Sequence, residues 1–150
     1  MTTRLGVYVC RRGAGIVALA AILLAAGFGC SRPTGSNLSL VPARMDLAGS
    51  YMANDLGVVS FFGEGTLKSS VNLHKGPVKI TIGAIGDPSA TPVVAVNLEG
   101  RPVGELSLNS PDPRNYVMVA DVERSGTTTL ALSVSKAWAI INTVSVQQGG

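Results

Sequence analysis

The chain has 150 residues, of which 46% are hydrophobic, 14% charged and 5% aromatic, and its formal charge is +3. A chain of this length is expected to form one folded domain, because it rarely supplies two separate hydrophobic cores. The charge excess lies in Arg4, Arg11 and Arg12, since the other nine of the 12 basic residues balance nine acidic ones. A neutral body with one histidine and no cysteine after Cys30 argues against nucleic-acid binding, a zinc site or thiol chemistry.

Residues 1–29 are predicted to form an export signal. A basic stretch ends at Arg12, an uncharged apolar run covers residues 16–26, and the small residues Gly27 and Gly29 flank Phe28. This order is typical of a secretory signal peptide. The apolar run is shorter than the about twenty residues that a transmembrane helix needs.

The end of this segment resembles a bacterial lipoprotein signal, with Gly29 and Cys30 at the last two positions of the lipobox. The resemblance implies that Cys30 becomes the lipidated first residue of an exported, membrane-anchored protein. The alternative is ordinary signal cleavage, which leaves Cys30 as a single thiol in an exported protein. Residues 30–37 are polar and rich in turn formers, so we expect a flexible tether there and a folded domain over residues 38–148.

The body is predicted to consist of short strands. Residues 78–82 and 129–134 alternate between apolar and polar side chains, as half-buried strands do. Residues 93–98 and 116–122 are more continuously apolar and are expected to be central strands, with weaker candidates at 57–62, 66–73, 103–108 and 138–146. A hairpin turn is expected at residues 98–102, and longer loops at 83–92 and 109–115.

Eight or nine short strands at this spacing indicate an all-β domain, an antiparallel β-sandwich. A jelly roll is the first choice and an immunoglobulin-like sandwich the second, because the chain lacks the cysteine pair of an immunoglobulin domain. The strand pattern predicts that twelve side chains mostly face inward: Val78, Ile80, Ile82, Val94, Val96, Leu98, Val117, Val119, Leu130, Leu132, Val144 and Val146.

Three stretches, at residues 76–86, 91–104 and 116–146, resemble the jelly-roll carbohydrate-binding modules that are appended to polysaccharide-degrading enzymes. The resemblance covers roughly residues 64–147 and implies a non-catalytic, glycan-binding domain at the cell envelope. Such modules commonly hold a structural Ca²⁺ with acidic residues, but Asn142 stands where an Asp is common and Glu64 has no acidic neighbour. No other cofactor is expected, calcium is doubtful, and the sequence assigns no metal ligand.

The candidate ligand-binding residues are two aromatic side chains at strand entrances, Tyr116 and Trp138, and two polar ones in the proline-containing loop, Asp112 and Asn115. Aromatic faces stack on sugar rings, and amide or carboxylate groups fix sugar hydroxyls. Each ring has the alternative of packing at the rim of the core. Phe61 and Phe62 are adjacent, so one of them faces in and the other out.

Two functions remain open. The first is binding of a polysaccharide, to which we commit. The alternative is a structural or protein-binding envelope lipoprotein, with an envelope protein as its partner and no glycan ligand. An enzyme is not expected, because the sequence offers no set of nucleophile, base and orienting group.

Overall fold

The computed structural model describes residues 36–135 and 138–149. The predicted signal peptide, Cys30 and most of the predicted tether lie outside the described residues. In the described part, no helix is both long and apolar enough to span a membrane.

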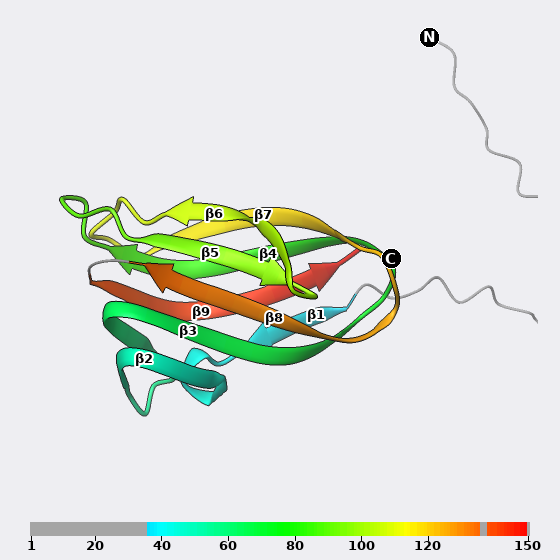
Figure 1. Ribbon diagram of the computed structural model, residues 1–150, viewed down its shortest axis with the longest axis horizontal. Helices are drawn as coiled ribbons and strands as arrows, with labels where there is room; N and C mark the ends of the chain where they lie inside the picture. Colours follow the sequence, from blue (N-terminus) through cyan, green and yellow to red (C-terminus); the bar gives the residue numbers. More distant parts are fainter. Residues whose placement is uncertain (1–35, 136–137, 150) are drawn as a thin grey trace, which may run out of the picture. The chain divides into compact units, whose positions relative to one another are not determined.

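The domain is an antiparallel β-sandwich, as the sequence predicted (Figure 1). A single turn of 3-10 helix, η1, lies between the first two strands, and every strand pairing is antiparallel. The elements in chain order are β1 (Asn37–Leu40), η1 (Pro42–Arg44), β2 (Asp46–Ala53), β3 (Val59–Leu73), β4 (Gly76–Gly86), β5 (Val93–Leu98), β6 (Arg101–Ser107), β7 (Arg114–Val122), β8 (Gly126–Ser135) and β9 (Ala139–Gln148).

The strands form two layers that share β3. One layer runs β6-β5-β8-β3, and the other runs β3-β9-β4-β7 with β1 also paired to β9. The start of β3 pairs with β9, whereas its longer second part, residues 65–73, pairs with β8. Figure 1 shows β3 passing around one end of the sandwich between the two layers.

The hairpin of β2 and β3 follows this bend because glycines lie where its strands approach most closely. Gly49 has a φ of +102°, and a Cβ at this position would overlap the carbonyl oxygen of Glu64. The register of β2 against β3 also shifts between Gly49 and Tyr51. Such a bulge increases local twist and re-aims the strand.

The core lies between the two layers and follows the predicted alternation in most strands. In β4, for example, Val78, Ile80 and Ile82 are at most 1% exposed, while Lys79 between them is exposed. The predicted hairpin joins β5 to β6 through Glu99 and Gly100, whose φ values of +57° and +76° fit a two-residue turn. The largest fully buried side chains are Phe61, Leu67, Leu73, Ile80, Ile82, Leu108, Leu130, Leu132, Ile141, Val59, Val71 and Val78.

The prediction for residues 116–122 is wrong in two respects. This segment belongs to β7, which among the described residues pairs only with β4 and is therefore an edge strand, not a central one. Val117 and Val119 face outward and are 51% and 70% exposed. Their neighbours Met118 and Ala120 pack against the core instead, because Met118 pairs with the buried Ile80.

Several strand boundaries also differ from the predictions, and two strands were not predicted. The segments 57–62 and 66–73 are parts of the single strand β3. The predicted loop 83–92 is shorter, because β4 continues to Gly86 and pairs with the start of β9. The strands β1 and β2 were not predicted. β1 alternates but covers only four residues, and β2 contains Gly49 and shows little alternation.

Candidate functional site

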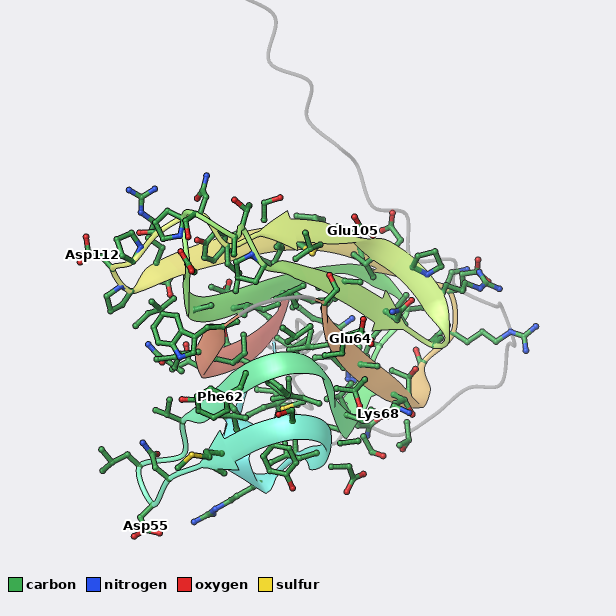
Figure 2. The ribbon with its side chains drawn as sticks, turned by 60° about the vertical axis from the view of Figure 1, so that its left-hand side comes forward. Asp55, Phe62, Glu64, Lys68, Glu105 and Asp112 are labelled. Carbon is green, nitrogen blue, oxygen red and sulfur yellow. The ribbon has the colours of Figure 1, made fainter. Side chains whose placement is uncertain are left out.

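Two aromatic side chains lie at neighbouring positions on the outer face of β3 and at the start of β9. Phe61 pairs with Ala139, and both are fully buried. Phe62 follows Phe61 and Trp138 precedes Ala139, so strand alternation places both on the opposite, outer face. Phe62 is 54% exposed and Trp138 38% exposed. In the view of Figure 2, Phe62 lies between the loop that carries Asp112 and the turn that carries Asp55.

Further apolar side chains continue this surface across three strands. Met52 of β2 pairs with Ser60, Ser60 pairs with Ile140, and Ile140 pairs with Ile85 of β4. Met52 is 66% exposed, and the two isoleucines are half-buried. We call this set the apolar strip: Met52, Phe62, Ile85, Trp138 and Ile140.

Amide and hydroxyl groups border the apolar strip where β9 bulges. Gly83 pairs with Thr143 and Ala84 with Ile141, so Asn142 has no counterpart on β4. Gly83 also pairs with Asn115 of β7. A Cβ on Gly83 would collide with the Thr143 hydroxyl and lie 3.2 Å from Asn115 Oδ1, so these two side chains lie over the glycine on the outer face.

The loop that carries Asp112 is held by its own side chains and by β4. The Ser110 hydroxyl accepts a hydrogen bond from the Asp112 N–H at 3.2 Å and donates one to the Asp112 carbonyl at 3.0 Å. The Gly86 N–H donates to the Ser110 carbonyl at 2.9 Å. Leu108 is fully buried. This loop is therefore preorganised by Ser110 and Leu108, in addition to the two prolines that the sequence indicated.

A second loop at this end is closed by Asp87. Its Oδ1 accepts hydrogen bonds from the Ser89 hydroxyl at 2.6 Å and the Ser89 N–H at 2.8 Å. These bonds stabilise the ionised carboxylate and lower the pKa of Asp87. The carboxylate therefore serves the turn at the end of β4.

The structure separates the four predicted ligand-binding residues. Trp138 is exposed next to the Phe61–Ala139 pair, Asn115 lies over Gly83 with Thr143, and Asp112 is exposed in its loop. Tyr116 points the other way, because it follows Asn115 in the strand. Its ring packs against the core, and its hydroxyl is buried without a hydrogen-bond partner in the described part of the chain.

Phe62 is the residue that sequence reasoning did not assign. The signal was the phase of β3, in which Val59, Phe61, Leu67, Val71 and Leu73 occupy odd positions. This phase places Phe62 outward. No local sequence pattern indicates that Trp138 lies near Phe62, because this depends on the pairing of β3 with β9.

The described residues offer no cluster of acidic side chains for a calcium ion. Residues 36–135 and 138–149 contain no cluster of three or more acidic, histidine or cysteine side chains that would hold a metal ion. Ca²⁺ takes six to eight oxygen ligands.

Comparison with solved structures finds this fold in carbohydrate-binding modules. The family 6 module at the C-terminus of a laminarinase from Zobellia galactanivorans has a TM-score of 0.64 at 15% identity, covering 75% of this chain and 100% of the module. A family 36 module of a xylanase from the hindgut metagenome of Trinervitermes trinervoides has a TM-score of 0.62 at 15% identity, covering 77% of this chain and 98% of the module.

A third module comes from a lichenase of Cellvibrio mixtus and was solved in complex with cellotriose. It has a TM-score of 0.62 at 10% identity, covering 75% of this chain and 98% of the module. These likenesses establish a carbohydrate-binding-module-like jelly roll as the fold. No protein-family model matches the chain, and no curated protein matches it either.

Proposed function

We propose that this protein is a non-catalytic glycan-binding domain of the cell envelope, exported and anchored through a lipid on Cys30. The observation that carries glycan binding is that Phe62 and Trp138, each next to the paired residues Phe61 and Ala139, are both exposed on a fold shared with carbohydrate-binding modules. The ligand of this site is then a polysaccharide chain, held by stacking and hydrogen bonds.

The chemistry of the site suits a sugar ring. The apolar faces of pyranose rings stack on aromatic side chains, and a small number of polar groups fix their hydroxyls. Asn115, Asn142 and Thr143 supply amide and hydroxyl groups beside the apolar strip. One or two stacked rings with a few hydrogen bonds correspond to a Kd between about 1 μM and 1 mM, or about −8 to −4 kcal/mol.

The position of the site relative to the chain start supports a tethered binding domain. The Gln148 N–H donates to the Ser36 carbonyl at 2.9 Å, so the first described residue lies at the end of β9. Trp138 lies just before the start of β9, whose ten residues span about 33 Å. A tether that leaves near Ser36 therefore places the apolar strip at the far end of the domain, away from the anchored end.

Glu64 and Glu105 do not lie on neighbouring strands. Glu105 pairs with Ala95, Ala95 with Ser133, and Ser133 with Thr66 of β3, so β5 and β8 separate Glu105 from Glu64. Figure 2 shows Glu64 and Glu105 on separate strands.

Glycan binding is tested by affinity electrophoresis and calorimetry against plant and bacterial polysaccharides. We expect Trp138→Ala and Phe62→Ala to remove binding while the circular dichroism spectrum stays that of the native protein. Val41→Ala is the matched control, because Val41 is 41% exposed but lies outside the apolar strip. If no polysaccharide retards the protein, or if both variants bind as the wild type does, the proposal is refuted.

Lipidation is tested separately by mass spectrometry of the membrane fraction. We expect the mature chain to start at Cys30 with an attached diacylglyceryl mass, and Cys30→Ser to abolish that product. A mature N-terminus at another residue contradicts the anchor without affecting the glycan site.

The alternative, a protein-binding envelope lipoprotein, is favoured by one observation. Leu56 in the turn between β2 and β3 is 87% exposed, and Met52 is 66% exposed. Exposed apolar side chains of this kind mark protein interaction sites. Capture of one envelope protein that Leu56→Ala abolishes, together with no retardation by any polysaccharide, favours the alternative.

A further inference from the structure

The strand β7 has an open edge. It pairs with β4 along nine residues, from Gly76–Val122 to Ala84–Arg114, without a register shift. Within residues 36–135 and 138–149, no other strand pairs with β7 and no loop backbone bonds to it. The backbone groups on its second side are thus available to another strand.

This edge has few of the features by which proteins prevent edge-to-edge pairing, and its charged residues, Arg114 and Asp121, lie near its two ends. Between Asn115 and Val122 the strand contains no proline, no lysine and no bulge. Its outer face instead carries Val117 and Val119, which are 51% and 70% exposed. Natural edge strands are commonly protected by charged residues, prolines or bulges, so an open apolar edge indicates a partner.

The strand β6 does not cover this edge. The side chain of Met118 points into the sandwich, and its Cε lies 2.6 Å from the place where a Cβ on Gly104 would be. Because an inward side chain reaches β6, that strand lies across the sandwich from β7. A hollow of about 220 Å³, lined by Val103 of β6 and Val119 and Asp121 of β7 among others, separates the two strands beyond this contact.

We propose that a second copy of this chain pairs with this edge, β7 against β7 in antiparallel orientation about Met118. A two-fold axis at Met118 brings Val117 opposite the partner's Val119, so both exposed valines of each copy are covered. The same register places Asn115 opposite the partner's Asp121, an amide donor against a carboxylate. Self-complementary patches of this kind form two-fold symmetric dimers, and cross-strand pairs of this kind stabilise a sheet.

The charges that flank β7 match the same axis. Asp112 precedes the strand and Arg124 follows it, and both are exposed. The proposed register brings the turn with Arg124 beside the loop with the partner's Asp112, twice per dimer. Within one chain the two residues are separated by the length of β7, about 40 Å for twelve residues in extended conformation, so they cannot interact directly in a monomer.

A charge-swap experiment follows from this separation. The full chain is purified in a non-ionic detergent, and its association is measured by sedimentation velocity over a range of protein concentrations at low salt. Asp112→Arg and Arg124→Asp each place like charges together, and we expect each to weaken dimerisation about tenfold. The double variant restores opposite charges, and we expect its dimerisation constant to return to within about threefold of the wild-type value.

Two further variants complete the test. Val119→Lys places a charge on the open edge and is expected to give a monomer that remains folded. Asp55→Arg is the control, because Asp55 is an exposed acid in the turn between β2 and β3, on the opposite side of the domain from Asp112 (Figure 2). This variant should dimerise as the wild type does. A wild-type chain that stays monomeric at all concentrations overturns the proposal. So does a double variant that is no better than the single ones, or a Val119→Lys protein that still dimerises. Glycan binding by a monomeric chain leaves the proposed function intact, so the two proposals fail independently.

Discussion

Replacing Gly86 by alanine should destabilise the domain, because the end of β4 is packed against the loop after β6. A Cβ on Gly86 would overlap the carbonyl oxygen and the Cβ of Leu108 and lie 2.9 Å from the Leu108 carbonyl carbon. Two of these atoms belong to the backbone, so no rotamer change relieves the overlap. The loop must move, which also lengthens the 2.9 Å hydrogen bond from the Gly86 N–H to the Ser110 carbonyl.

The expected magnitude follows from three effects. Overpacking costs about 1–3 kcal/mol, and the weakened hydrogen bond costs about 1 kcal/mol. Replacing glycine by alanine restricts the unfolded chain and returns about 0.4–1 kcal/mol. The free energy of unfolding should therefore fall by about 2 kcal/mol, which lowers the urea midpoint by about 1 M.

Gly63→Ala is the matched control for this measurement. Gly63 has no positive φ, and the nearest atom to its added Cβ is the Ser50 Cβ at 4.0 Å. Only the unfolded-state effect remains, so this variant should be neutral or slightly more stable than the wild type. Equal urea midpoints for the two variants would refute the steric argument.

Three further predictions concern single side chains. Tyr116→Phe removes a buried hydroxyl that has no partner in the described residues. Thermal unfolding should show that the variant is as stable as the wild type or more stable by up to about 1 kcal/mol. A loss of stability would indicate a hydrogen bond that the structure does not show. Val96→Asp buries an unpaired charge at a fully buried position and should unfold the domain. Val119→Asp, at a position that is 70% exposed, should leave the circular dichroism spectrum unchanged. If both variants are unfolded, the orientation of β7 is contradicted. The pKa of Asp87 is lowered by its hydrogen bonds to Ser89, so Ser89→Ala should raise this pKa toward its ordinary value in an NMR titration. Because the folded-state pKa is depressed, the turn's contribution to stability is present above the unfolded pKa and is lost as pH falls through the folded pKa. An unchanged Asp87 titration would refute this cause.

The sequence was sufficient for the strands in which one face is apolar and the other polar. In β4 and β8 the alternation allows only one orientation, since the opposite one would bury Lys79 or a row of threonines and serines. The turn at Glu99 and Gly100 could also be predicted from its own residues, because a two-residue hairpin needs residues that tolerate positive φ. These features established an all-β antiparallel sandwich.

The orientation of β7 could not be read from its own residues. Both sets of alternate positions are apolar, with Val117 and Val119 in one set and Tyr116, Met118 and Ala120 in the other. A continuous apolar run fits either face, and a shift by one residue exchanges them. Only the pairing with β4, which brings Met118 opposite the buried Ile80, decides which set enters the core.

The candidate site depended on tertiary structure for the same reason. The sequence determined that one of Phe61 and Phe62 faces outward, and it singled out Trp138 as the opening of a strand. It did not determine that Phe62 and Trp138 are neighbours, because β3 and β9 are distant in the chain and their register is set by packing of both layers. Alternation along a strand is a local property, whereas the contact between two strands is fixed only when the core between the layers is filled.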